Sequence, residues 1–293
     1  MLRYHANRNH ALPEKRCPLA LDEATMRRTV GFRVRLAVLL GLLAATLTWA
    51  WHDVHSRRAR NEWQRPLEVA VALVQLGSVD PGTIGALRAR FPALEARLRD
   101  EYHRHGGQLA RPVQFTLFGP VTVDRAPPAD PDATLLKLAQ HAYEQWRWTH
   151  AVDVGSHLPT RGFDSRIYLL LRAPHDQSRS WVEGSSELGG RVGIARVDLA
   201  PSTVDLALFV IAHELFHTLG ASDKYDSSGR ALLPEGLVEP ERVPLYPQRY
   251  AEVMTRNLVL AAGIERPPDS LAELGVGTLT ARELGWSHSE RPK

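Results

Sequence analysis

The most informative stretch of the sequence is His213-Glu214-Leu215-Phe216-His217-Thr218-Leu219-Gly220-Ala221-Ser222-Asp223. At about 3.6 residues per turn, His213 and His217 project from one face of a helix, so both imidazoles can reach a single cation. Glu214 lies about 100° around the helix from His213, beside the cation rather than on it. A carboxylate in that position can take a proton from a water that the cation has acidified and can later deliver it to a leaving amine. The stretch therefore predicts a zinc hydrolase.

Two histidines leave a catalytic zinc site one protein ligand short, and the third must come from beyond these helical turns. Gly220 makes this possible, because a glycine just past a helix end can adopt the left-handed conformation that stops the helix and turns the chain back. Asp223 would then return towards the metal. Asp226, three residues further on, is a rival that could bind instead or orient a ligand.

The helix that carries the motif is predicted to be buried. The run from Val204 to Ala212 is apolar on nearly every face. Two histidines and a glutamate directly after it would be costly there without a partner such as a metal, which disfavours the alternative that they are ordinary helix residues. Ser202 and Asp205 have the spacing of a helix-capping box.

The motif resembles that of the metzincin metallopeptidases, which carry H-E-x-x-H-x-x-G-x-x-H or -D followed by a methionine turn beneath the metal. The variant with Asp as third ligand, as in the snapalysin-type enzymes, is the one that this chain resembles. The resemblance implies Zn²⁺ bound by His213, His217 and Asp223, with Glu214 as the catalytic base of a zinc-dependent endopeptidase. It also implies a metzincin-like fold whose methionine turn is at Met254, since the other two methionines lie far upstream.

Other polar side chains near the motif are weaker candidates. Three tyrosines lie in or near the segment before the methionine: Tyr225, Tyr246 and Tyr250. In some metzincins a tyrosine there binds the metal or stabilises the oxyanion, but we expect these three to be rim or core aromatics. Three glutamates would serve a site that takes its third ligand from a later helix: Glu235, Glu239 and Glu241. Prolines among them disfavour such a helix.

Composition limits the possible partners. The chain has 293 residues, of which 44% are hydrophobic, enough for one sizeable core with an appendage. The formal charge of +3 comes from scattered arginines. No basic stripe with interleaved aromatics is present, so we expect no nucleic-acid partner. Cys17 is the single cysteine, which excludes an intrachain disulfide.

An uncharged, mostly apolar run of sixteen residues extends from Leu36 to Trp51, with arginines on both sides. We interpret residues 33–52 as a transmembrane signal anchor rather than a cleaved signal or a buried soluble helix. Residues 1–32 would be a disordered or cytoplasmic segment, with Met26 as an alternative start, and 53–65 a juxtamembrane stalk. The zinc metallopeptidase domain, 66–288, would then face the exoplasmic or periplasmic side, or be secreted if the signal is cleaved.

Periodicity within the domain predicts strands at 67–76, 113–117, 167–171 and 192–199, and helices at 83–104 and 134–148. Short helical pieces are expected at 270–274 and 281–284, after a loop at 225–250. The order is that of an α+β or α/β fold with a mixed twisted sheet before the active helix. Residues 189–195 are either an edge strand that holds an extended substrate or a plain hairpin strand.

An extended peptide or protein is therefore the expected substrate. Two alternatives are a zinc amidohydrolase acting on a non-protein substrate and a metal-stabilised binding module without turnover. The presence of Glu214 disfavours the second, because binding alone needs no base.

Overall fold

The structure is a computed structural model that describes residues 22–128, 134–159, 161–174, 182–186 and 189–287. Its chain forms two compact units, residues 1–55 and 56–293, and helix α1 (Asp22–Arg60) runs through the division. Cys17 and most of the expected segment 1–32 lie outside the described residues.

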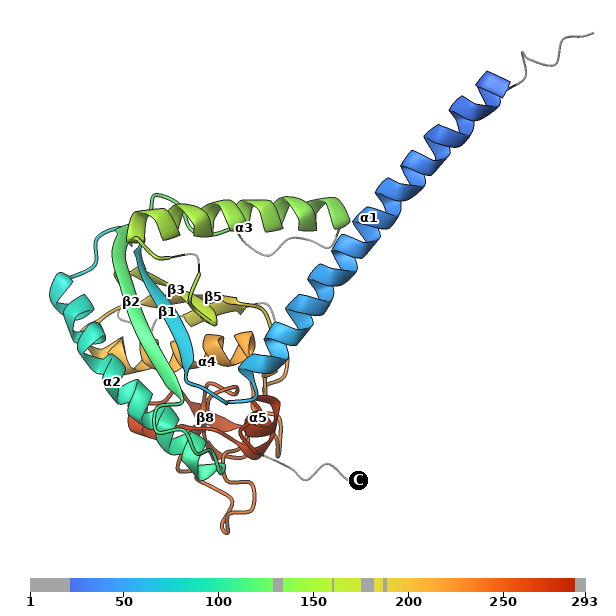
Figure 1. Cartoon of the computed structure of the whole chain (residues 1–293). Helices are drawn as coiled ribbons and strands as arrows, with labels where there is room; N and C mark the ends of the chain where they lie inside the picture. The colour runs from blue at the N-terminus through green and yellow to red at the C-terminus, as the bar shows by residue number, and fades with distance from the viewer. Residues whose placement is uncertain (1–21, 129–133, 160, 175–181, 187–188, 288–293) are drawn as a thin grey trace, which may run out of the picture. The chain divides into compact units, whose positions relative to one another are not determined.

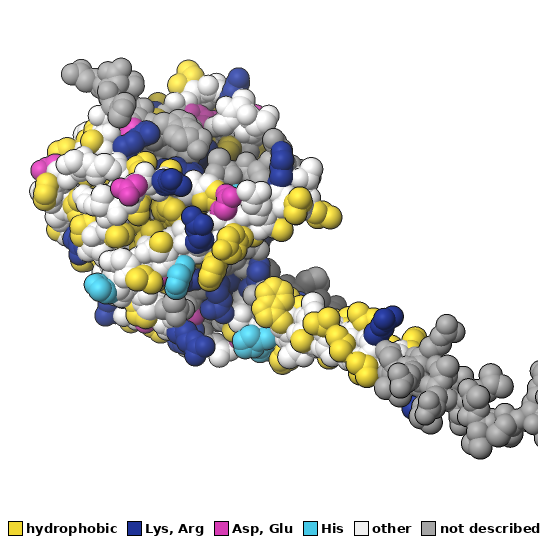
Figure 2. All heavy atoms as spheres, turned by 90° about the horizontal axis from the view of Figure 1, so that it is seen from above, with side chains coloured by type: hydrophobic (Ala, Val, Ile, Leu, Met, Phe, Trp, Pro, Cys, Tyr) yellow, Lys and Arg dark blue, Asp and Glu magenta, His cyan; other side chains and the backbone are white. Residues whose placement is uncertain are grey.

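In the first unit, α1 carries the apolar run on an exposed surface. The large apolar side chains from Phe32 to Val54 are exposed, and they form the yellow surface of the extended helix in Figure 2. The part from Phe32 to Arg60 is long and apolar enough to cross a membrane, a criterion that a signal sequence near the N-terminus also meets. The helix is longer than the 33–52 segment expected from the sequence.

The second unit is built on a five-stranded sheet with the strand order β2-β1-β3-β5-β4. Four strands are parallel: β1 (Leu67–Gln75), β2 (Val113–Thr122), β3 (Ser165–Arg172) and β5 (Val192–Asp198). The edge strand β4 (Val182–Ser186) is antiparallel to β5. The mixed sheet predicted from the sequence is therefore present.

Helices cover both faces of this sheet (Figure 1). On one face, Val69, Val71 and Leu73 of β1 belong to the main core with α2 (Pro81–Arg104) and α4 (Val204–Thr218). On the other face, a smaller core joins alternate residues of β1 to Val152 of α3 (Leu135–Ser156). Burial on both faces explains why residues 69–74 of β1 form a continuous apolar run in the sequence.

The chain after α4 has little regular structure. Its elements are β6 (Ala251–Glu252) paired with β9 (Leu274–Gly275), β7 (Leu258–Ala261) paired with β8 (Ile264–Arg266), a 3-10 turn η3 (Leu271–Glu273), and α5 (Thr278–Glu283). Trp286 joins this region to the helices, because its ring lies 5.6 Å from Tyr102 of α2 and 5.5 Å from Phe216 of α4. Residues 225–250 contain no helix and only an isolated bridge between Tyr225 and Ala231, as expected for a loop.

The edge strand differs from the expectation. Residues 189–195 do not lie at the edge, because β5 is paired with β3 on one side and β4 on the other. The edge on this side of the sheet is β4, a strand that the sequence did not indicate, and β2 forms the opposite edge.

The start of α4 also differs from the expectation. Pro201 begins a 3-10 turn, η2 (Pro201–Thr203), in which the Thr203 hydroxyl accepts a 2.8 Å hydrogen bond from the Ala200 amide. Asp205 instead accepts a hydrogen bond from the Leu271 amide and forms an ion pair with Arg90. The capping box expected from Ser202 and Asp205 is therefore absent, because the extra turn moves the helix start.

Residues 56–65, which the sequence assigns to the end of a stalk, lie in the second compact unit. Arg60 is buried and donates hydrogen bonds to the carbonyl oxygens of Gly189 and Gly190. The indole nitrogen of Trp63 donates to the carbonyl oxygen of Leu284 over 2.6 Å. This segment is thus part of the folded unit.

Candidate metal centre

The motif lies on the last two turns of α4 and on the turn that follows. His213 and Glu214 are buried, with 3% and 1% of their surface exposed. The helix ends at Thr218, and Gly220 adopts a left-handed φ of +99°. The Gly220 amide donates to the His217 carbonyl and the Ala221 amide donates to the Phe216 carbonyl, each over 3.0 Å. These two bonds form a Schellman motif, which reverses the chain as the sequence predicts.

The reversal brings three ligand atoms together. The Nε2 atoms of His213 and His217 lie 3.1 Å apart. The Oδ1 atom of Asp223 lies 3.4 Å from the first and 3.2 Å from the second. Ligands bound at the usual zinc distances in a tetrahedron are separated by about 3.3 Å, so the three atoms fit three corners of a zinc site. Among the described residues, this is the one group of three or more His, Cys, Asp or Glu side chains arranged to hold a metal ion.

The outer nitrogens of both imidazoles are held by backbone carbonyls. His213 Nδ1 lies 2.9 Å from the carbonyl oxygen of Val253, and His217 Nδ1 lies 2.8 Å from that of Ala221. A carbonyl can only accept, so each Nδ1 carries a proton, and in the neutral ring each Nε2 is an acceptor. Two acceptor nitrogens and a carboxylate oxygen then face one another, an arrangement that a cation stabilises.

The close approach of the three side chains shifts their pKa values. Burial, followed by the neighbouring His217, lowers the pKa of His213. Burial also lowers the pKa of His217, but the hydrogen bond with Asp223 and the charges of Asp223 and Glu214 outweigh it and raise that pKa. Burial raises the pKa of Asp223, but the hydrogen bond from His217 and the charges of both histidines lower it overall. A metal ion would take the place of the proton that His217 and Asp223 share.

Glu214 lies beside this group rather than within it. Its Oε1 atom is 4.0 Å from His213 Nε2, and its side chain is almost fully buried. The helix therefore places a buried carboxylate beside the ligand atom of His213.

Met254 is buried on the turn below the histidines. Val253, immediately before it, supplies the carbonyl that fixes His213, and the Met254 carbonyl accepts a 2.9 Å hydrogen bond from the Lys224 amide. The carboxylate of Glu252 accepts from the amides of Met254 and Thr255. The methionine turn is thus connected both to the first histidine and to the residue after Asp223.

A second set of contacts holds the loop around Asp223. Lys224 is buried, and its Nζ atom lies 2.9 and 2.7 Å from the two carboxylate oxygens of Glu283 on α5. The same carboxylate accepts from the amide and the hydroxyl of Ser222. Both neighbours of Asp223 are therefore attached to one glutamate.

The alternative ligands lie elsewhere. Asp226 is exposed, and its carboxylate accepts from Ser228 and from the Arg230 amide. Three glutamates lie outside the ligand group: Glu235, Glu239 and Glu241. Of these, Glu239 forms an ion pair with Arg249.

The three tyrosines differ in position. Tyr225 reaches the centre, since its hydroxyl hydrogen-bonds to Asp223. Burial, opposed by the charge of Arg256 and reinforced by that of Asp223, raises the pKa of Tyr225 to about 12, so its hydroxyl remains a donor at neutral pH. Tyr250 lies under the guanidinium of Arg97 instead. Tyr246 is partly exposed. The expectation that these are rim or core aromatics does not hold for Tyr225.

Sequence reasoning missed Arg256, Lys224 and Glu283. Arg256 lies two residues after Met254, and its guanidinium carbon is 4.3 Å from the centroid of the Tyr225 ring. The position of Lys224 next to Asp223 was a usable signal, since the chain has few lysines. Glu283 lies far along the chain, and no sequence signal linked it to the motif.

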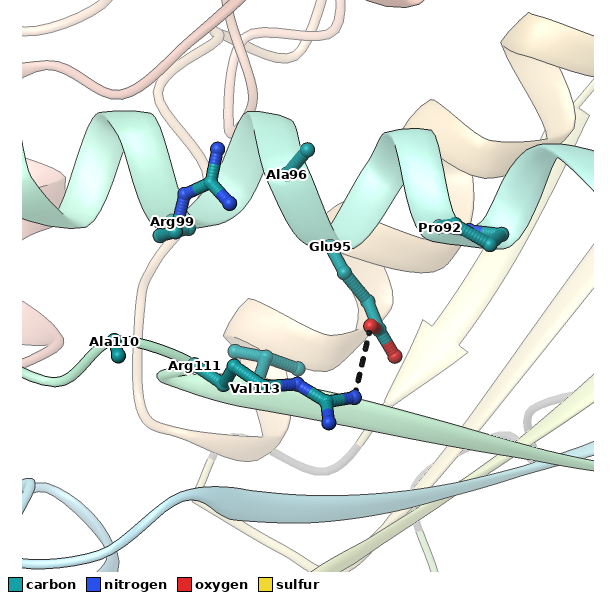
Figure 3. Close-up of a pocket in the computed structure, with 7 residues that line it drawn as sticks. All are labelled: Pro92, Glu95, Ala96, Arg99, Ala110, Arg111 and Val113. Atoms are coloured by element: carbon teal, nitrogen blue, oxygen red, sulfur yellow. Dashed lines mark ion pairs between the residues drawn. The ribbon is translucent and has the colours of Figure 1, made fainter.

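A pocket elsewhere in the unit has a structural explanation (Figure 3). It lies between α2 and the chain entering β2, where Glu95 points towards Arg111 at a distance of 3.5 Å. Glu95 also accepts from the Phe115 amide of the edge strand. The Glu95 carboxylate therefore joins α2 to strand β2, and its contacts explain it as a structural residue.

No protein-family model matches the chain, and no curated protein matches it. Its structure is similar to that of the archaemetzincin of Methanopyrus kandleri, with 14% identity, a TM-score of 0.31, and coverage of 57% of this chain and 80% of the other. It is also similar to the archaemetzincin of Archaeoglobus fulgidus, solved in complex with malonate, with 15% identity, a TM-score of 0.31, and coverage of 74% and 99%. Archaemetzincins are metzincin zinc peptidases, and the group of His213, His217 and Asp223 is consistent with the motif of that family. Both similarities are distant.

Proposed function

We propose that the protein is a zinc-dependent peptidase in which His213, His217 and Asp223 hold the metal and Glu214 is the general base. One observation supports this most strongly. The three ligand atoms are separated by 3.1 to 3.4 Å with both histidine Nδ1 atoms already bound to carbonyls, so the histidine lone pairs converge on one point.

When bound, zinc lowers the pKa of water and polarises the substrate carbonyl. Glu214 removes a proton from the attacking water and delivers it to the nitrogen of the scissile bond as that bond breaks, so the products are a carboxylic acid and an amine. Its burial beside the ligand group excludes bulk water from this transfer. The Tyr225 hydroxyl donates its single proton to Asp223, and turning that proton to the substrate would let it stabilise the developing oxyanion.

The edge strand β4 favours an extended peptide as substrate. A free sheet edge can bind an extended chain through backbone hydrogen bonds. After β4, the Gly189 amide donates a 2.8 Å hydrogen bond to the carbonyl oxygen of His217, so the end of this edge is attached to the motif helix. We therefore assign to β4 the substrate-aligning role that the sequence suggested for residues 189–195.

We further propose that α1 anchors the protein in a membrane with the catalytic unit on the exoplasmic or periplasmic side. The exposed apolar surface of α1 supports this, and secretion after signal cleavage is the alternative.

The test uses the full chain purified in detergent, loaded with one equivalent of zinc and incubated with a diverse peptide library. Mass spectrometry should detect cleavage that a chelator abolishes and that one equivalent of zinc restores. Stoichiometric zinc without cleavage of any peptide would contradict the proposal, and would favour a non-peptide amide substrate or a binding module.

A further inference from the structure

Arg256 places a positive charge beside the metal centre. Its guanidinium stacks on the ring of Tyr225, whose hydroxyl hydrogen-bonds to the ligand Asp223. The positive charge of Arg256 acts to lower the pKa of both Tyr225 and His213. Arg256 thus lies next to the ligand group, against the tyrosine that contacts Asp223.

The guanidinium has no carboxylate partner within the described part of the chain. None of the ion pairs found among those residues includes Arg256, although other arginines of the same unit are paired, such as Arg97 with Glu101 and Arg249 with Glu239. Stacking on a tyrosine occupies one face of the guanidinium and leaves its N–H edge available. That edge matches a carboxylate in a bidentate geometry.

The backbone gives a second, independent reason to regard Arg256 as more than a packing residue. Its φ is +69°, and its amide donates a 3.0 Å hydrogen bond to the Glu252 carbonyl, which closes the methionine turn. Glycine or asparagine would adopt this conformation with less strain. The turn itself does not require arginine. The strain of this backbone conformation therefore suggests that the arginine side chain has a role of its own.

We infer that Arg256 is a substrate-binding residue that recognises a carboxylate next to the scissile bond. This inference rests on the proposed peptidase function and deepens it, since it names acidic peptides as the preferred substrates. The carboxylate can come from an Asp or Glu side chain or from the free C-terminus of a peptide. In the first case the protein is an endopeptidase with acidic specificity, and in the second it releases C-terminal residues.

The experiment compares matched peptides on the zinc-loaded full chain. One set carries Glu, Gln or Lys next to a single scissile bond, and the other set ends in a free or an amidated C-terminus at that position. An Arg–carboxylate pair predicts that kcat/KM for the acidic or free-carboxylate peptide exceeds that of its neutral counterpart by about tenfold or more. The set in which the difference appears identifies the source of the carboxylate.

The variants Arg256→Asn and Arg256→Asp test the residue, since both replacements tolerate a positive φ. The first should abolish the preference between the Glu and Gln peptides, and the second should favour the Lys peptide. Arg230→Ala is the matched control, because Arg230 is exposed in the same region but is not placed at the ligand group. Equal cleavage of all peptides by the wild type, or a preference that survives in Arg256→Asn, would overturn the inference and leave the peptidase intact.

A binding measurement separates this inference from the proposed function. Fluorescence anisotropy of the labelled Glu and Gln peptides on zinc-loaded Glu214→Gln does not require turnover. A preference for Glu that disappears in Glu214→Gln/Arg256→Asn would support carboxylate recognition even if no peptide were cleaved. Equal binding of both peptides would contradict it.

Discussion

The Nδ1 atom of His213 lies 2.9 Å from the carbonyl oxygen of Val253, the residue immediately before Met254. This contact joins the motif helix to a turn 40 residues later and fixes which nitrogen of the imidazole faces the metal position. Since Lys224 donates to the carbonyl of Met254, the same turn also supports the loop that carries Asp223. The methionine turn is therefore a common support for ligands on two different segments.

The identity of the third ligand can be tested by two alanine variants. Asp223→Ala should weaken zinc binding by more than about 100-fold, since it removes a ligand rather than an outer partner. Asp226→Ala is the control and should change affinity little, because its carboxylate binds Ser228 and Arg230. Competition with a zinc-binding dye measures both, and the reverse ranking would contradict the assignment.

The Glu283 contacts predict a positioning role for a residue that touches no metal. Glu283→Gln should weaken zinc binding by about 10-fold to 100-fold, because both neighbours of Asp223 lose a charged partner. Glu273→Gln, which removes an ion pair with Arg266 instead, is the matched control.

Loss of Glu283 also leaves the buried Lys224 without its carboxylate partner, with only the carbonyl and hydroxyl of Ser222 remaining, at a cost of about 3 kcal/mol. The double variant Lys224→Met/Glu283→Met avoids that penalty, so it should fold and still bind zinc weakly. Wild-type affinity in the folded double variant would show that these contacts do not position Asp223.

Glu252 predicts a pH dependence of stability. Burial, only partly offset by hydrogen bonds from the amides of Gly277 and Met254, raises the pKa of Glu252 from 4.5 to about 7. The unfolded chain ionises first as pH rises, so the contribution of Glu252 is complete below about pH 4.5 and is lost as pH rises through about 7. This shift corresponds to a loss of about 3 kcal/mol in the free energy of unfolding.

Glu252→Gln removes that titration. Urea unfolding of the full chain at pH 4.5 and pH 8 should therefore show a smaller fall in the free energy of unfolding for the variant than for the wild type. An identical fall in the two proteins would mean that Glu252 is ionised in the folded state throughout this range.

The N-terminal helix predicts where the protein is found. A full-length form with a C-terminal tag should fractionate with membranes, and its tag should be digested when spheroplasts or intact cells are treated with protease. A soluble form shortened by about fifty residues would favour a cleaved signal. Full-length protein in the cytosol would contradict both.

Much of the fold could be predicted because its strands and helices have strong local signals. The strand at 67–76 and the helix at 83–104 match β1 and α2 closely, since burial makes their apolar patterns unambiguous. Pro92 lies inside α2 without ending the helix. The helix expected at 134–148 extends to Ser156, because its last turns pack on the sheet while its first half is exposed.

The metal ligands could be predicted because their spacing is local. His213 and His217 are one helical turn apart, and the turn at Gly220 returns the chain within a few residues. Glu283, Arg256 and the Val253 carbonyl could not be predicted, because they reach the site through folding of a region with little regular structure. The position of β4 was also missed, since strand order depends on long-range pairing that a single strand pattern does not specify.

The most direct test of the proposed chemistry is a comparison of Glu214→Gln with the wild type by zinc content and peptide cleavage on the same preparation. Glutamine has the same shape but cannot accept the proton, so zinc should remain at about one per chain while cleavage falls by at least about 100-fold. Unchanged cleavage would contradict the role of Glu214 as base. Loss of zinc together with activity would contradict the placement of Glu214 outside the metal-binding group.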